Sequence, residues 1–453
     1  MARVFYRTVE VVGRQNLPAR GPAIVCANHT NALADVVVLQ AASDRVLHPL
    51  ARSGLFQKPL LRPILGFIRA VPVYRAQDPG SDTGQNRGSF DRCFELLGAG
   101  GALVMFPEGV SHSEPALQPL KTGAARIALG SHLVGGPLPV VVPAGLTFVE
   151  KGRFRSRVLV QIGPALTLDE VELAPSAEAP TLGIAVEPPA PAVREITARI
   201  DSAIRDLTLN AERWEDLRLL RQLERFFHFR RGRHPGRFSL ERRFRTLQRM
   251  LRAHDQLRRD APVQLERLRR RLLRFERLRR LYRIEDYHLQ ARPELAPLAG
   301  RLVAGLLLGL ALLGPATWGL LTSGPAYALV SWWAPRASER FDQYDTNKIV
   351  LGIFAYGSLW GIELTWICLR FGVWPAGALF ALSLPVAAAA GLGLKGLVAR
   401  LFDDGRAFVL FRRRRELRRY LLERRLEIEG DLAMLARRAR SRKVGTQRKA
   451  CSA

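Results

Sequence analysis

The sequence is poor in cysteine: its 453 residues contain only Cys26, Cys93, Cys368 and Cys451, with no CxxC spacing. Cysteines this far apart exclude a disulfide framework and the common zinc sites. The opening stretch MARVFYRTVEVVGRQNLP also lacks the apolar run of a secretory signal. We therefore expect a reducing compartment, no metal centre, and an N-terminal domain that stays in the cytoplasm.

Acidic residues are scarce relative to basic ones, with 41 Asp+Glu against 69 Lys+Arg and a net charge of +28. Residues 211–290 hold 24 Arg against 11 acids, and residues 400–453 hold 17 Lys+Arg against 7 acids. Such a surface attracts nucleic acid or an anionic membrane leaflet. Glycine-interleaved aromatics of the RNA-binding kind are missing, and the charge flanks apolar segments. We predict anionic membrane lipids as partners and no nucleic acid, with a solvated helix face as the alternative reading of the arginines.

A long uncharged run extends from Leu302 to Pro335, which exceeds the roughly 20 residues needed to cross a bilayer. Four helix-breaking residues interrupt it: Pro315, Gly319, Gly324 and Pro325. The run is therefore one helix with an interfacial tail, a re-entrant element or a tight helical hairpin.

A second apolar region runs from Ile349 to about Leu394 and is divided by Arg370 and the turn-like FGVWP at 371–375, which predicts two helices in a hairpin. Basic segments flank the whole apolar region, so both flanks should face the cytoplasm and the number of crossings should be even. Glu363 either pairs with Arg370 or faces a cavity.

Leu and Phe recur at three- and four-residue spacing among the arginines of residues 205–290, with one break at Pro235-Gly236, a pattern typical of long amphipathic helices. The expected organisation has five parts: a catalytic domain (1–172), a linker or surface loop (173–192), a basic amphipathic region (193–293), a transmembrane region of two to four spans (294–400), and a basic cytoplasmic helix and tail (401–453).

The first 165 residues alternate short apolar runs such as AIVCA, ALVMF and PVVVPAGL with helical stretches, which indicates an α/β fold. In such folds, reactive groups lie in loops beyond the strand ends. Several uncommon residue groups stand at those junctions.

The first group is ANHTNALAD, in which His29 directly follows a strand and Asp35 lies about one turn into the next helix. Neutral imidazole suits the removal of a hydroxyl proton near pH 7, and a carboxylate on its far nitrogen fixes the tautomer. Taken alone, such a pairing is more often structural than catalytic.

Two further groups follow strands. In VMFPEGVSH and the later LKTG, Pro and Gly shape a turn in which amides and hydroxyls face an anion. In AVPVYR, Arg75 leaves a strand and suits a bidentate phosphate contact. The alternatives are a plain strand-to-helix turn and a surface charge.

Taken in order, ANHTNALAD, AVPVYR, FPEGVSH and VVVPAGL resemble the four blocks of the glycerol-phosphate and lysophosphatidate acyltransferase family, over about residues 5–165. The resemblance implies an N-terminal acyltransferase domain with a mixed sheet flanked by helices, followed by basic amphipathic helices and C-terminal transmembrane helices. It makes His29 the base and Asp35 its partner. It also implies a substrate-binding set: Asn31, Arg75, Glu108, Gly109, Ser111, Lys121 and Pro143.

The box usually has four residues between His and Asp, whereas five separate His29 from Asp35 and Ala34 holds the four-spaced position. This spacing, with FPEGVSH and LQPLKTG, is similar to the subgroup of fungal glycerol-3-phosphate and dihydroxyacetone-phosphate acyltransferases and their bacterial relatives. The DTNKIVLGIFAYGSLW stretch also looks like theirs.

The resemblance implies an integral membrane enzyme, in a bacterial inner membrane, with its catalytic domain on the cytoplasmic face. It would transfer an acyl group from acyl-CoA or acyl carrier protein to glycerol 3-phosphate or dihydroxyacetone phosphate, without a cofactor, and amides of the Glu108-Gly109 turn would stabilise the oxyanion. Lysophosphatidate or another lysophospholipid is the alternative acceptor. An inactive membrane scaffold is the alternative of another class.

Overall fold

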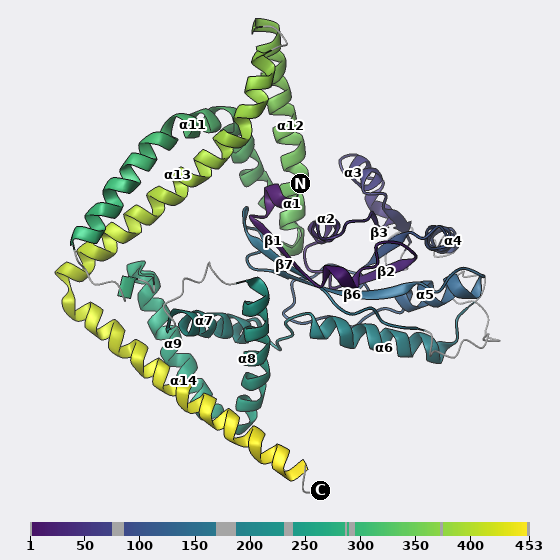
Figure 1. Cartoon of the computed structure of the whole chain (residues 1–453), viewed down its shortest axis with the longest axis horizontal. Coiled ribbons are helices and arrows are strands. Elements are labelled where there is room, and N and C mark those ends of the chain that lie inside the picture. Colours follow the sequence, from purple (N-terminus) through teal and green to yellow (C-terminus); the bar gives the residue numbers. More distant parts are fainter. Residues whose placement is uncertain are drawn as a thin grey trace. The chain divides into compact units, whose positions relative to one another are not determined.

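The structure is a computed structural model, shown in Figure 1. It describes residues 2–74, 86–168, 187–230, 239–285, 288–289, 295–371 and 375–450. The chain divides into two compact units. Unit 1 comprises Met1–Asp216, Ser239–Phe244 and Ser331–Ile353, and unit 2 comprises Leu217–Phe238, Arg245–Val330 and Phe354–Ala453. The domain boundaries expected from the sequence stay predictions.

Unit 1 contains one mixed sheet, in which β6 and β7 run antiparallel and the other neighbouring strands run parallel. Its described strands follow the order β1-β7-β6-β2-β5-β3-β4. Their bounds are Thr8–Val12 (β1), Ala23–Ala27 (β2), Leu47–Arg52 (β3), Val71–Val73 (β4), Ala102–Met105 (β5), Val140–Phe148 (β6) and Arg157–Ile162 (β7). The predicted α/β class is confirmed.

Helices cover both faces of this sheet because its central strands are apolar on both sides. From β2, Ile24 and Cys26 join one buried cluster with Ile196, whereas Val25 joins the other with Val38, as expected from the alternation of side chains along a strand. Figure 1 shows α5 and α6 on one side of the sheet and α2 on the other. The helices are α1 (Ala2–Phe5), α2 (Leu33–Ala42), α3 (Arg62–Phe67), α4 (Asn86–Gly98), α5 (Gly123–Leu133) and α6 (Ala190–Asp206), with short 3-10 turns η1 (Arg14–Asn16) and η2 (Ser53–Leu55).

Helix α6 belongs to the core of unit 1. Ile196, Ile200 and Ile204 recur every fourth residue and are buried in the cluster that covers β2 and β5. This four-residue spacing places them on one helical face. The basic amphipathic segment therefore contributes its first helix to the sheet domain.

Long basic helices follow, as the amphipathic pattern predicts: α7 (Trp214–Arg230), α8 (Leu240–Asp260), α9 (Pro262–Tyr282) and, at the end of the chain, α14 (Arg415–Ala450). Helices α9 and α14 pack against each other in unit 2, where Arg271 lies 2.8 Å from Asp431. The predicted break at Pro235-Gly236 lies outside the described residues.

Three helices within the described residues are long and apolar enough to cross a membrane. They are α11 (Leu295–Arg336), α12 (Tyr344–Phe371, preceded by the turn η5 at Phe341–Gln343) and α13 (Ala376–Arg413). Helix α11 runs without interruption through Pro315 and Pro325, so a tight hairpin in that run is wrong. Two helices, α12 and α13, occupy the second apolar region as predicted. The even number of crossings stays a prediction, because length and composition do not test it.

Candidate active site

The loop that follows β2 is fixed by a side chain that continues the sheet. Asn28 is buried and exchanges two hydrogen bonds with the backbone of Leu146 on β6, accepting at 2.7 Å and donating at 3.1 Å. Because the amide copies the pattern of a backbone group, the loop leaves the sheet in a defined direction. His29 is the next residue.

His29 and Asp35 meet despite their five-residue separation. His29 Nδ1 lies 2.9 Å from Asp35 Oδ2, which also accepts the backbone N–H groups of Thr30 and Asn31 at 2.8 Å each. Ala32 has the positive φ of 46° that closes this turn ahead of α2. A carboxylate only accepts hydrogen bonds, so Nδ1 carries the proton and Nε2 presents its lone pair.

The rest of the His29 ring is held by the turn after β5. Phe106 stacks on the imidazole with ring centroids 4.0 Å apart. Glu108 is buried and accepts the N–H of His29 at 2.6 Å and the N–H of Gln118 at 2.7 Å, while its second oxygen also faces His112 Nε2. Protein donors thus occupy both oxygens of Glu108, which favours a positioning role over direct contact with an acceptor.

Gly109 brings Lys121 over the turn. The backbone at Gly109 has φ of 73°, and an added Cβ would lie 2.8 Å from Cδ and Cε of Lys121. The Gly109 N–H already donates to the carbonyl of Phe106 at 2.9 Å, so this amide is not the oxyanion donor that the sequence suggests. Lys121 is an exposed residue that supplies a cation to this turn.

Two further predicted residues point toward the segment that begins α12. Ser111 Oγ donates to Asp342. Asn31 is fully buried and donates from Nδ2 to Asp345 at 2.6 Å and to the Tyr6 hydroxyl at 3.3 Å. Asn31 is therefore turned away from solvent, and its side chain links the loop after β2 to Asp345 and Tyr6.

Tyr6 completes this buried polar cluster. Its hydroxyl donates to Asp345 at 3.2 Å. Burial raises the pKa of the phenol well above its ordinary value, and the neighbouring carboxylates of Asp345 and Asp35 raise it further. The hydroxyl therefore stays protonated and available as a donor.

The structure brings most of the predicted site residues to one edge of the sheet. His29 lies on the loop after β2 and Asp35 in the first turn of α2, and the loop after β5 carries Glu108, Gly109, Ser111 and Lys121. Pro143 is different: it lies inside β6, paired with Cys26, so it supports the sheet without reaching the loop. Arg75 lies outside the described residues.

Four residues of the cluster are absent from the prediction: Tyr6, His112, Asp342 and Asp345. A signal for the last two is present in the sequence, because DQYDTNK introduces polar residues at the start of an otherwise apolar helix. Its placement against the loop after β2 depends on tertiary structure alone.

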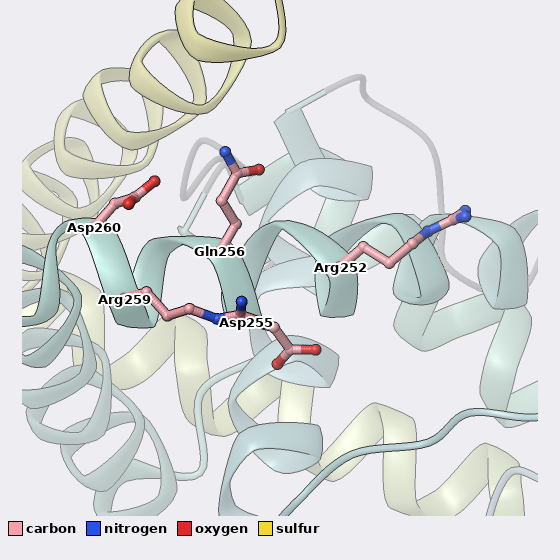
Figure 2. Close-up of a pocket in the computed structure, with 5 residues that line it drawn as sticks. All are labelled: Arg252, Asp255, Gln256, Arg259 and Asp260. Carbon is pink, nitrogen blue, oxygen red and sulfur yellow. The ribbon is translucent and has the colours of Figure 1, made fainter. Parts of the chain in front are cut away.

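Elsewhere, a pocket on α8 is lined by Arg252, Asp255, Gln256, Arg259 and Asp260 (Figure 2). All five side chains come from one helix, and none belongs to the His29 cluster. Among the described residues, no group of three His, Cys, Asp or Glu side chains is placed to hold a metal ion.

Comparison with known proteins finds similarity over this part of the chain. Residues 8–146 match the family model Acyltransferase. Glycerol-3-phosphate O-acyltransferase 2 of Saccharomyces cerevisiae is 38% identical over 85 residues, which are 18% of this chain and 11% of the yeast protein. The 1-acyl-sn-glycerol-3-phosphate acyltransferase of Bacillus subtilis is 32% identical over 121 residues, which are 26% of this chain and 56% of that protein.

The chain thus spans only a small part of its yeast relative and little more than half of the bacterial one. Among solved structures, the 1-acyl-sn-glycerophosphate acyltransferase PlsC from Thermotoga maritima aligns with a TM-score of 0.31 and 16% identity, covering 45% of this chain and 72% of that one.

Proposed function

We propose that the chain is a member of the glycerol-phosphate and lysophosphatidate acyltransferase family, which its similarity over residues 8–146 supports, and that it transfers a fatty acyl group to a hydroxyl of a glycerol phosphate. The observation that carries the proposal is the His29–Asp35 pair, in which Nδ1 lies 2.9 Å from the carboxylate of Asp35 and the imidazole stays partly exposed. An inactive scaffold has no need of this arrangement.

The reaction needs one base and no covalent intermediate on the protein. His29 Nε2 takes the proton of the acceptor hydroxyl as its oxygen attacks the thioester carbonyl. The tetrahedral oxyanion then collapses, the carbon–sulfur bond breaks, and the imidazolium of His29 gives its proton to the departing thiolate, which restores the free base. Asp35 stabilises that imidazolium while it lasts.

The acceptor phosphate is assigned to Lys121, whose side chain crosses Gly109 in the turn after β5, together with Arg75. A phosphate bound by Lys121 would hold the acceptor at the turn whose Glu108 contacts the His29 loop. Acyl-CoA or acyl carrier protein supplies the thioester.

Glycerol 3-phosphate is the favoured acceptor, because the yeast relative named for it has the higher identity, 38%. Lysophosphatidate is the second candidate, since the Bacillus relative, which is aligned over a larger share of its own length, is named for that acceptor. Both molecules present the same phosphate and hydroxyl to the site.

Attachment to a membrane suits this chemistry, because the acyl chain and the product belong in a bilayer. Helices α11 to α13 are compatible with membrane association, and the arginine-rich helices suit anionic headgroups. We place the catalytic domain on the cytoplasmic face of a bacterial inner membrane.

The test is transfer of labelled acyl-CoA to glycerol 3-phosphate, dihydroxyacetone phosphate and lysophosphatidate by membranes that contain matched amounts of wild-type protein or His29→Ala. Loss of the base should lower the rate about a thousandfold. The acceptor that gives product names the substrate.

The matched control is His132→Ala, which removes an exposed histidine of α5 and should leave the rate within about twofold, as for most surface changes. Wild-type membranes that give no product with any acceptor, even with acyl carrier protein as donor, would contradict the proposal. So would full activity in His29→Ala.

A further inference from the structure

The end of α11, the start of α12 and the short polar stretch between them belong structurally to the sheet domain. Ser331–Ile353 is part of unit 1, and Ile349 is buried in one of its apolar clusters. Lys348 Nζ donates to the carbonyl of Gly152 at 2.6 Å, which fastens the same helical turn to the loop after β6. The sheet domain is therefore completed by residues more than 300 positions after His29 in the chain.

Asp345 of this segment reaches the His29 loop through one intermediate. It is fully buried and accepts hydrogen bonds from Asn31 Nδ2 at 2.6 Å and from Tyr6 at 3.2 Å. The backbone N–H of the same Asn31 donates to Asp35 Oδ2, the oxygen that faces His29. Asp345 thus holds the residue that orients the carboxylate of the pair.

A second carboxylate contacts the other loop of the site. Asp342 is buried and accepts the hydroxyl of Ser111. The residue after Ser111 is His112, whose N–H donates to the carbonyl of His29 at 3.1 Å and whose ring faces Glu108. Asp342, just before α12, and Asp345, in its first turn, therefore contact both loops that carry the proposed chemistry.

We propose that Asp345 is a positioning residue for the His29–Asp35 pair, so that the start of an apolar helix completes the active site of the sheet domain. The inference rests on the proposed function for its kinetic consequence. Its structural consequence, a loop at residues 28–36 held in place by Asp345, is measurable without any assay of activity.

The competing explanation is that these contacts only attach the start of α12 to the sheet domain. Lys348 helps to separate the two, because it bonds the same turn to the carbonyl of Gly152, whereas Asp345, which also interacts with Gly152 and Lys348, accepts from Asn31. A residue that only attaches the helix should behave like Lys348. A residue that positions the pair should act through Asp35.

Hydrogen exchange of the full-length protein gives the first test. Asp345→Ala should speed amide exchange in the peptide covering residues 28–36, because Asn31 loses its anchor and the N–H bonds of Thr30 and Asn31 to Asp35 open more often. Lys348→Met is the control and should leave that peptide protected. Equal protection in wild type and Asp345→Ala, in properly folded protein, overturns the proposal.

Steady-state kinetics with acyl-CoA and the active acceptor give the second test. Asp345→Ala should lower kcat about tenfold or more while KM for both substrates stays within about threefold, since a loosened base is misaligned and binding is retained. Asp345→Asn keeps an oxygen that accepts from Asn31 and should recover most of the loss. Tyr6→Phe removes one hydroxyl without emptying the site and should give an intermediate kcat, which keeps the test open if Asp345→Ala folds poorly.

The double variant Asp35→Ala/Asp345→Ala tests whether the effect of Asp345 on kcat depends on Asp35. It should be no slower than Asp35→Ala alone, because the influence of Asp345 passes through Asp35. A further tenfold loss in the double variant, or a Lys348→Met variant as slow as Asp345→Ala, overturns the positioning role. An inactive wild-type protein refutes the proposed function and leaves the exchange experiment to decide this inference.

Discussion

Ala32 is the residue that lets His29 and Asp35 meet. Its φ of 46° and ψ of −126° lie in a region that glycine occupies readily and that a Cβ disfavours. The turn absorbs the extra residue between the pair and places Asp35 in the first turn of α2. Backbone strain of this kind costs of order 1–3 kcal/mol and persists only where the surroundings enforce it.

We predict that Ala32→Gly stabilises the protein and preserves its activity, because glycine adopts this conformation without strain. After allowing for the greater entropy of the unfolded chain, the gain should be about 1 kcal/mol. The measurement is the midpoint of thermal unfolding in detergent.

Ala34→Gly is the matched control for that substitution. Ala34 is a buried residue inside α2 with helical geometry, so glycine there should lower stability by about 1 kcal/mol. A lower midpoint in Ala32→Gly would show that the backbone at Ala32 is not strained.

Cys26 and Cys93 should resist alkylation in the folded protein. Both are buried, and burial raises the pKa of each thiol to about 12. At pH 8 the reactive thiolate is therefore scarce as well as enclosed. Peptide-resolved mass spectrometry after iodoacetamide treatment should find both unmodified in native protein and both modified in denaturant. Rapid labelling of native Cys26 would mean that β2 opens.

The turn between β5 and α5 is the element that carries the second half of the site. Its left-handed glycine lets the chain reverse beneath Lys121, and the carboxylate of Glu108 joins this turn to the His29 loop. The geometry of this turn holds Lys121 against Gly109, next to Glu108, which accepts the backbone N–H of His29.

We predict that Gly109→Ala impairs transfer more than Gly21→Ala does. Both glycines have positive φ, of 73° and 86°, so both substitutions bear the left-handed cost of about 1–2 kcal/mol. Only the Cβ at Gly109 collides with Lys121, since nothing lies within 4 Å at Gly21. The kcat/KM for the phosphate acceptor should fall about tenfold or more in Gly109→Ala alone. Equal losses in the two variants would remove Lys121 from the proposed site.

The residues that link α11 to α12 belong to the sheet domain, because Asp342 and Asp345 are bonded to it. Among the described residues, the candidate spans are α11, α12 and α13. Helix α11 has 42 residues and would measure about 63 Å if straight, about twice the thickness of the hydrocarbon layer, so its length does not match one simple crossing.

We predict that α12 and α13 supply the two full crossings. The unit 2 part of α12, Phe354–Phe371, is about 27 Å long, close to the thickness of the hydrocarbon layer. Single cysteines, introduced into a variant whose four native cysteines have been replaced, report which side of the membrane each position faces. Glu339→Cys and Arg413→Cys should be labelled from the side of the sheet domain, and Phe371→Cys from the opposite side.

Labelling of Glu339→Cys and Phe371→Cys from the same side would contradict a full crossing by α12. Arg413→Cys serves as the internal reference, because the arginines that follow it favour the cytoplasmic face.

The sequence by itself determined the features that depend on local pattern. The apolar runs around β2, β5 and β6 specify buried strands because both their faces must leave water, and the three- and four-residue spacing of Leu and Phe specifies the long helices. The order of the motifs was enough to name His29 and Asp35. Their contact in the structure agrees with that choice, and their catalytic roles remain to be tested.

Tertiary structure alone decided which neighbours those residues have. Nothing local distinguishes a glutamate that contacts substrate from Glu108, whose oxygens are held by three protein donors, or reveals that Asn31 turns toward Asp345. These partners are brought together by burial of apolar surface far from them in the chain, as when Ile349 enters the core of the sheet domain. Hydrogen bonds across such distances form only after that burial has fixed the backbone, which is why the sequence pattern does not contain them.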